Sequence, residues 1–196
     1  MEKINFIKTF IPQGQYRQKY EYGNMVVYHI NAEYNKEMNA YECYECTMPK
    51  AMFDETKVRS AFSQFSAKMD ALKLEEAKAE KIAEITAYDT SSSVNGFMLN
   101  GLLVWLDKAT RVGLMNSTTI AKAAGQETTT LWLGGAKLVV DCDKAIQLLS
   151  ALEMYALECF NVTASHKQAV SELTTIEEVE AYDYKAGYPK MHEMSV

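Results

Sequence analysis

Two twelve-residue stretches decide the fold: GFMLNGLLVWLD at residues 96–107 and TLWLGGAKLVVD at residues 130–141. A constant offset of 34 positions aligns the two copies, matching Leu99 with Leu133, Gly101 with Gly135 and Asp107 with Asp141. Asn100-Gly101 is the preferred pair for a two-residue type I′ hairpin turn, because both turn positions need a positive φ. Each stretch therefore predicts a β-hairpin, and the closing aspartate is well placed to cap a following helix.

A helix is expected after each hairpin. The first should run from Asp107 to a stop at Gly125, and the second from Asp141 to about Thr174, along which apolar residues recur at alternating steps of four and three. A unit that is too small to bury its own apolar face is typical of an internally duplicated domain. We therefore predict an α+β domain over residues 88–196, with a duplicated hairpin–helix unit (ββα-ββα) forming a four-stranded antiparallel sheet packed on helices.

The N-terminal part should contain a second β structure. Residues 25–48 alternate apolar and polar side chains around a polar loop and predict a β-hairpin. Residues 1–24 show no clean period and predict an irregular or partly extended arm. A lone hairpin is marginally stable in water, so we expect it to pair with another element or another chain. Together these residues make a first segment, 1–53.

Residues 54–87 predict one long connecting helix, because Asp54 can cap it and neither Gly nor Pro interrupts it. Its apolar residues form a coiled-coil seam of two heptads: Val58, Phe62, Phe65, Met69 and Leu72. The seam has two interpretations. It packs against its own domain, or it is a self-association helix that joins copies of the chain. A polar linker at residues 87–93 separates this helix from the C-terminal domain.

Composition excludes several classes of partner. The formal net charge of −6 disfavours nucleic-acid binding, which needs a basic surface to neutralise phosphates. No apolar run approaches the roughly 18 residues of a membrane span. Lys8 and Pro12 interrupt the apolar residues near the N-terminus, so we expect no signal peptide and a cytoplasmic location.

The sequence offers no catalytic constellation, so we expect no enzyme activity, no cofactor and no metal site. Cys43 and Cys46 form a C-x-x-C motif, but on a strand residues three apart point to opposite faces, which predicts ordinary packed cysteines. His166 and Cys159 share one face of the long helix. A histidine with satisfied hydrogen bonds is a better interpretation there than a metal ligand.

A cluster of aromatic and charged residues is the more informative feature. It comprises Trp105, Asp107, Arg111 and Trp132. One interpretation is core aromatics with a salt bridge between Asp107 and Arg111, which are one helical turn apart. The other is an exposed patch of aromatic residues and arginine used as a contact hot spot.

A set of short stretches within residues 88–188 forms a further pattern: Tyr88-Asp89-Thr90-Ser91 with Val94-Asn95, Trp105-Leu106-Asp107 with Thr110-Arg111, Leu131-Trp132, Ala145, Leu152-Glu153, Tyr155-Ala156, Cys159, Thr163, His166, Tyr182-Asp183-Tyr184 and Gly187-Tyr188-Pro189. In these stretches the chain resembles a domain family of unassigned function from phages and prophages. Members of that family are often encoded near tail and tail-fibre genes and have no established catalytic residues.

The resemblance implies a tail-associated structural or assembly protein that acts through protein–protein contacts. Its partners would be other phage structural or tail proteins and further copies of the chain in a homo-oligomer. Its location would be the bacterial host cytoplasm during assembly, with the virion as the alternative. The candidate contact residues are Trp105, Arg111, Trp132, Tyr182 and Tyr184.

A second hypothesis belongs to a different class of function. In it the domain binds a small ligand or processes a substrate of unknown specificity. The pocket would lie between the sheet and the long helix, around Trp132, Cys159 and His166.

Overall fold

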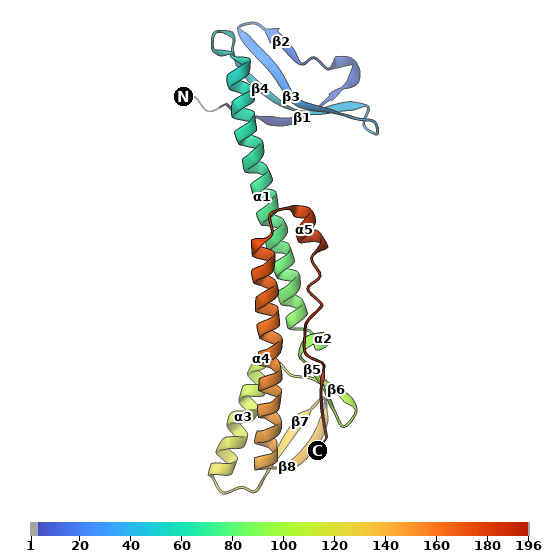
Figure 1. Ribbon diagram of the computed structural model, residues 1–196, viewed down its shortest axis with the longest axis vertical. Helices are drawn as coiled ribbons and strands as arrows, with labels where there is room; N and C mark the ends of the chain where they lie inside the picture. Colours follow the sequence, from blue (N-terminus) through green and yellow to red (C-terminus); the bar gives the residue numbers. More distant parts are fainter. Residues whose placement is uncertain (1–3, 196) are drawn as a thin grey trace. The chain divides into compact units, whose positions relative to one another are not determined.

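The structure, a computed structural model, describes residues 4–195, and the chain divides into two compact units, Met1–Lys73 and Leu74–Val196 (Figure 1). The division falls within the long helix α1 (Glu55–Asp89), earlier than the polar linker at residues 87–93. The reason is packing, because Ile82 and Ile85 near the end of α1 belong to an apolar cluster with the C-terminal helices.

Unit 1 is a four-stranded antiparallel sheet in the order β1-β4-β3-β2. Its strands are β1 (Ile7–Pro12), β2 (Lys19–Tyr22), β3 (Met25–Asn35) and β4 (Ala40–Pro49), with short 3-10 turns η1 (Gln13–Gln15) and η2 (Lys50–Met52). The predicted hairpin is β3–β4. Of the two forms expected for the N-terminal arm, the extended one is found and the irregular one is wrong, because β1 and β2 pair with the two outer edges of that hairpin and satisfy its backbone hydrogen bonds.

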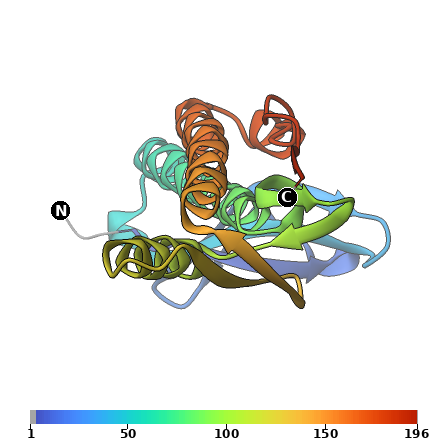
Figure 2. The same cartoon turned by 90° about the horizontal axis from the view of Figure 1, so that it is seen from below.

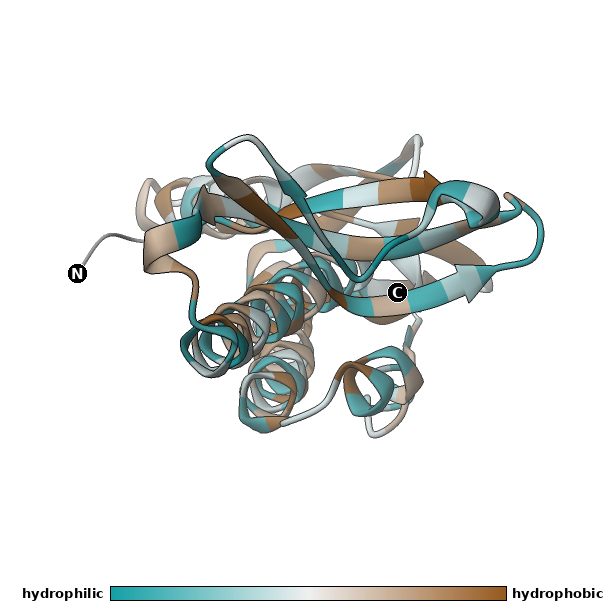
Figure 3. Ribbon diagram, turned by 90° about the horizontal axis from the view of Figure 1, so that it is seen from above, coloured by the Kyte–Doolittle hydropathy of each residue, from teal (hydrophilic) through white to brown (hydrophobic). Residues whose placement is uncertain are grey.

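The first part of α1 covers one face of this sheet. Val58 and Phe62 pack into a core with Tyr28, Ile30 and Cys46. Figure 3 shows teal and brown segments alternating along the strands, as expected for a sheet whose two faces differ in polarity.

The predicted self-association seam is used largely within unit 1. Val58 and Phe62 are buried, and Phe65 packs against the same core. These three side chains therefore hold the helix on its sheet. Leu72 remains 55% exposed, so self-association through this end of the seam stays a prediction.

Unit 2 repeats a hairpin and a helix. Its elements after α1 are α2 (Ser92–Asn95), β5 (Gly96–Leu99), β6 (Leu102–Trp105), α3 (Lys108–Ala123), β7 (Thr128–Leu133), β8 (Ala136–Asp141), α4 (Cys142–Glu172), α5 (Ile176–Ala181) and β9 (His192–Met194). Figure 2 shows each hairpin leading into its helix, β5–β6 into α3 and β7–β8 into α4. The predicted α+β class and the ββα-ββα order are confirmed.

The turns and caps of the two copies agree in detail. Asn100 and Gly101 have φ values of 50° and 80°, and Gly134 and Gly135 have 58° and 82°, so both turns have the positive φ pair of a type I′ turn. Asp107 accepts a hydrogen bond from the backbone N–H of Thr110, and Asp141 accepts from those of Asp143 and Lys144. Both aspartates cap their helices as expected.

The two hairpins do not form the predicted four-stranded sheet, and that expectation is wrong. β5 lies between β6 and the short strand β9, which joins it in parallel, while β7 and β8 form a separate two-stranded sheet. The hairpins meet through side chains instead. Their inward residues form one core with α4: Phe97, Leu99, Val104, Leu106, Leu131, Leu133, Val140, Ala145, Leu149 and Leu152.

One close approach links the copies directly. A Cβ atom added to Gly134 would come to 3.0 Å from Cγ2 of Val104, so the turn of the second hairpin lies against a side chain of the first. The copies differ in their aromatics too, since the 34-residue offset matches Trp105 with Val139, and Trp132 with Met98.

The chain after α4 returns along unit 2 as a strap. Thr175 and Glu178 form a capping box at the start of α5, and Val179 is buried against Ile85 and Val170. β9 then pairs with β5, and the Asn100 N–H donates to the Met194 carbonyl at 2.9 Å.

Within residues 4–195, none of the helices combines the length and apolar character needed to cross a bilayer.

Candidate functional site

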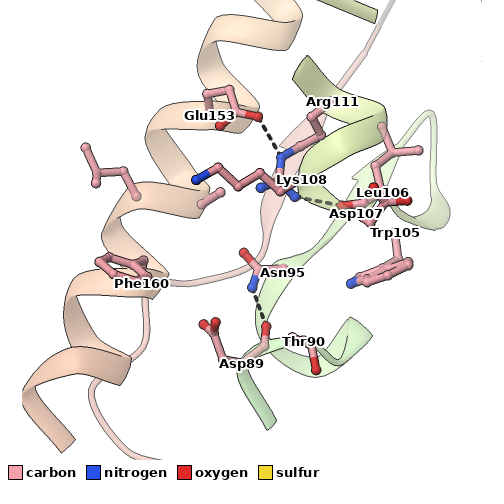
Figure 4. Close-up of a pocket in the computed structure, with 12 residues that line it drawn as sticks. Asp89, Thr90, Asn95, Trp105, Leu106, Asp107, Lys108, Arg111, Glu153 and Phe160 are labelled. Atoms are coloured by element: carbon pink, nitrogen blue, oxygen red, sulfur yellow. Dashed lines mark hydrogen bonds and ion pairs between the residues drawn. The ribbon is translucent and has the colours of Figure 1, made fainter. Parts of the chain in front are cut away.

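A cavity of unit 2 lies where the end of α1, α2, the end of β6 and the start of α3 face α4. Its volume is about 500 Å³, within the range typical of ligand pockets. Figure 4 shows its main lining residues: Asp89, Asn95, Trp105, Lys108, Arg111 and Phe160.

The short helix α2 is anchored on α4, and this anchoring positions one wall. The Val94 carbonyl accepts hydrogen bonds from the Tyr155 hydroxyl at 2.5 Å and from the Cys159 thiol at 3.3 Å. Burial raises the pKa of Tyr155 and the pKa of Cys159, so both groups stay protonated and able to donate. Asp89 is held in the same way, because its carboxylate accepts from the Thr163 hydroxyl at 2.8 Å.

Asn95 lies at the junction of α2 and β5, and glycine must follow it. A Cβ atom on Gly96 would collide with the Ser92 carbonyl oxygen. The Asn95 amide nitrogen donates to the backbone carbonyl of Asp89, which fixes the orientation of the amide. Its side-chain oxygen is buried and accepts no hydrogen bond from the residues the structure describes.

Arg111 is buried and ties α3 to α4. Its Nε donates to the Glu153 carboxylate at 2.8 Å, and one terminal nitrogen donates to the Leu106 carbonyl at 2.6 Å. The predicted salt bridge between Asp107 and Arg111 is therefore wrong. Asp107 is committed to its cap, accepting from both the backbone N–H and the hydroxyl of Thr110, so Arg111 pairs with α4 instead.

Of the charged side chains that line the cavity, Asp107 and Arg111 have partners within the protein, whereas Lys108 forms no ion pair within the described residues. The Thr110 backbone N–H, together with its hydroxyl, lowers the pKa of Asp107 from its usual value. Glu153 compensates Arg111. Lys108 takes part in none of the ion pairs formed within residues 4–195, and Figure 4 shows its side chain extending from α3 toward α4.

Apolar side chains make up the opposing walls. Trp105 is 41% exposed and Phe160 is 59% exposed, and they lie on opposite sides of the cavity in Figure 4. Leu157, one turn before Phe160 on α4, is 50% exposed. The site can therefore hold an apolar or aromatic group between two aromatic rings, with the Asn95 acceptor and the Lys108 cation among the residues that line it.

Comparison with known families bears on unit 2. Residues 76–186 match the family described as Domain of unknown function (DUF4376). The chain belongs to this family. No match was found among curated proteins or among solved structures. The matched residues run from the later part of α1 to a point just beyond α5, and they include the whole lining of the cavity.

The DUF4376 domain brings only part of the predicted contact set together. Trp105 and Arg111 line the cavity, but Trp132 lies on β7 and is 62% exposed. Tyr182 and Tyr184 pack within the domain, where Tyr182 bonds to His166 and the Tyr184 ring lies edge-on to Tyr88 with centroids 5.6 Å apart.

Trp132, Cys159 and His166, around which a pocket was expected, do not line this cavity. Both nitrogens of His166 are engaged, Nδ1 with the Tyr182 hydroxyl at 2.8 Å and Nε2 with the Ala186 carbonyl at 2.9 Å. A carbonyl can only accept, so Nε2 carries the hydrogen. This histidine has satisfied hydrogen bonds, as we expected.

Four of the main lining residues were not among the predicted contact residues: Asp89, Asn95, Lys108 and Phe160. A signal for Phe160 exists, because Met154, Leu157 and Phe160 lie outside the regular four-three seam of α4 and form an extra apolar strip. Asp89 and Asn95 belong to the stretches that carry the family resemblance, but nothing in the sequence assigned them a role in a site, and nothing marks Lys108. These roles depend on neighbours that are brought close only by folding.

The histidines and cysteines of the described chain do not line this cavity. His29 is buried, with Nδ1 2.5 Å from the Arg17 carbonyl oxygen and Nε2 3.1 Å from the Glu45 carboxylate. All four cysteines are free and buried, and burial raises the pKa of Cys46 to about 11. Across residues 4–195, no three His, Cys, Asp or Glu side chains gather so that they could hold a metal ion.

Proposed function

We propose that this DUF4376 protein is a phage or prophage tail-associated structural or assembly protein that acts through protein–protein contacts. The phage setting is supported by the resemblance of residues 88–188 to a family often encoded near tail and tail-fibre genes. The mode of action is supported by the surface of unit 2, and these two supports are independent of each other.

The observation that carries the proposal is the exposure of a tryptophan on each hairpin. Trp132 of β7 lies on the solvent-facing side of its sheet, diagonally across from Val139 of β8, which is 61% exposed. Trp105 of β6 shares the outer side of the first hairpin with exposed Leu103. Large apolar side chains gathered on outer faces are typical of interaction surfaces, and tryptophan is the residue most enriched at contact hot spots.

The strand edges favour the same conclusion. β7 and β8 pair only with each other among the strands of the described chain, so each presents a free backbone edge. An open edge can accept a strand from another molecule. We also propose that the protein works as a homo-oligomer, for which these edges and the exposed Leu72 are available.

A role without catalysis fits the state of the reactive groups. The cysteines are buried, and the ring nitrogens of His29 and His166 are engaged within the protein. We propose the host cytoplasm during assembly as its location, with the virion as the alternative. Binding of a small ligand remains the second candidate function, and the observation that favours it is the cavity between Trp105 and Phe160.

The test is co-purification with defined partners. The protein is co-expressed with each tail protein encoded by neighbouring genes, and complexes are isolated by size exclusion with light scattering. We expect a stable complex with at least one of them and loss of that complex in the Trp132→Ser, Val139→Ser double variant. Ile120→Ser, at an exposed position on α3 outside both hairpins, is the matched control. A strict monomer at high concentration that captures none of these proteins contradicts the proposal.

A further inference from the structure

The unpaired oxygen of Asn95 is the starting point. Its amide nitrogen is committed to the Asp89 carbonyl, so the amide cannot rotate to exchange its two ends. Asn95 lines the cavity, and its side-chain oxygen is buried and has no donor within the described chain. A buried acceptor without a partner costs free energy, which an incoming N–H or O–H group recovers.

The walls of the cavity fit an aromatic ring. Trp105 and Phe160 lie on opposite sides of the cavity (Figure 4). Ala156 of α4, whose side chain is small, also lines it. Aromatic rings in such a space gain from stacked or edge-to-face packing as well as from leaving water. A ring that also carries a hydrogen-bond donor satisfies the walls and the Asn95 oxygen together.

The exposure of the walls identifies the occupant as part of a protein. Phe160 is 59% and Leu157 is 50% exposed, and the apolar strip continues along α4 to exposed Met154. A small molecule inside the cavity would leave the outer parts of these side chains in water. A protein surface laid over the strip would cover them while it inserts one side chain, which is the usual arrangement of an anchor residue.

The charge at the rim narrows the chemistry of the partner. Arg111 is neutralised by Glu153, and Asp107 is committed to the N-terminus of α3. Lys108 is the lining cation that no ion pair within residues 4–195 satisfies. A carboxylate next to the inserted ring would give Lys108 an ion-pair partner.

We propose that this cavity is an anchor site for a partner protein, receiving a tryptophan or tyrosine side chain that donates to Asn95 and stands beside an acidic residue that pairs with Lys108. The inference rests on the proposed function, because it names the kind of partner that such contacts would engage. It places the contact at α4 and α2, away from the outer face of β7 and β8.

The direct test is a titration of the full ¹⁵N-labelled chain followed by NMR. The probes are acetyl-Asp-Gly-Trp-amide, acetyl-Lys-Gly-Trp-amide and acetyl-Asp-Gly-Phe-amide. We expect the first peptide to shift the indole signal of Trp105 and the side-chain amide signals of Asn95, while the indole signal of Trp132 stays in place. The lysine peptide should bind about two- to five-fold more weakly at low salt, as expected for the loss of an exposed ion pair. The phenylalanine peptide should bind about ten-fold more weakly, because it leaves the Asn95 oxygen unpaired.

Variants separate this site from a general apolar surface. Ala156→Leu fills the cavity and Phe160→Ala removes a wall, and both should abolish the shifts while the rest of the spectrum is unchanged. Lys108→Gln should make the affinities of the aspartate and lysine peptides equal. Lys137→Gln on β8 is its matched control and should leave their difference in affinity unchanged. The proposal is overturned if the tryptophan and phenylalanine peptides bind equally, if the shifts centre on Trp132, or if Ala156→Leu binds as the wild type does. It is also overturned if AMP, a small aromatic molecule that carries N–H donors and a negative charge, causes equal shifts, because the site would then accept a small ligand.

The outcome can be told apart from failure of the proposed function. A tail protein that is captured by the wild type and equally by Phe160→Ala and Ala156→Leu removes the anchor site and leaves the contact role standing. Peptide binding at the cavity with no tail protein captured supports the anchor site and removes the proposed role in tail assembly. If the chain forms dimers and Phe160→Ala dissociates them, the occupant of the cavity is a second copy of this chain. That result would overturn the proposal of a different partner protein.

Discussion

Arg111 of α3 and Glu153 of α4 form a 2.8 Å hydrogen-bonded ion pair across 42 positions of the chain. The same guanidinium also holds the Leu106 carbonyl at the end of the first hairpin. One side chain therefore joins the first hairpin, its helix and the long helix of the second copy at the edge of the cavity.

Replacing Arg111 with methionine should destabilise unit 2. The change keeps much of the apolar stem but leaves the Glu153 carboxylate and the Leu106 carbonyl without their donor, which should cost about 2–3 kcal/mol. Urea unfolding followed by circular dichroism measures it. Glu153→Gln, which retains an acceptor oxygen, should cost less than half as much. Equal stability of Arg111→Met and the wild type would show that the pair contributes nothing.

Replacement by alanine should have a large effect on stability at Leu131 of β7 and a small effect at the next residue, Trp132. Leu131 is 1% exposed and belongs to the core, so Leu131→Ala should cost about 2–5 kcal/mol. Trp132 points outward, and Trp132→Ala should change the free energy of unfolding by no more than about 0.5 kcal/mol. Thermal and urea unfolding of the two variants check the strand register. A larger effect at Trp132 would mean that the strand is shifted by one residue.

The cap at Asp107 predicts a specific dependence on pH. Hydrogen bonds from Thr110 lower the pKa of Asp107 below 3.8, its usual value. A carboxyl group with a lowered pKa in the folded state contributes stability above its unfolded-state pKa, and that contribution disappears as the pH falls through its folded-state pKa. Asp107→Asn keeps a capping oxygen but cannot titrate.

The free energy of unfolding of the wild type should therefore fall more steeply than that of Asp107→Asn as the pH is lowered from 5 through the region below 3.8. Urea titrations at a series of pH values give the difference between the two proteins. Parallel curves would show that Asp107 titrates alike in the folded and unfolded states.

The thiols should be unreactive in the folded protein. All four cysteines are buried, and the Cys46 pKa of about 11 leaves this thiol protonated at pH 8. Ellman's reagent should detect almost no thiol in the native protein and all four after unfolding in guanidinium chloride. One rapidly reacting thiol in the native state would point to an accessible cysteine and contradict the buried arrangement.

The local features of unit 2 could be predicted from the sequence because they depend on neighbours in the chain. The Asn100-Gly101 turn and the Asp107 and Asp141 caps are each formed by residues within four positions of one another. The order of hairpins and helices followed from these signals.

The way the strands assemble could not be predicted, because it depends on residues far apart. β9 is a three-residue strand that occupies the edge of β5 which a four-stranded sheet would have used. Arg111 had a local candidate in Asp107, and the sequence gives no reason to prefer Glu153 on another helix. The anchor cavity depends on the same long-range placement, so only Trp105 and Arg111 among its main lining residues were predicted to be contact residues.

The contact between Gly134 and Val104 also bears on how a duplicated unit diverges. The first turn carries an asparagine at the position where the second carries Gly134, and a Cβ atom there would lie 3.0 Å from the Val104 side chain of the other copy. The two halves have thus become unequal: exchanging their turn sequences would require Val104 or the second turn to shift to make room for the asparagine.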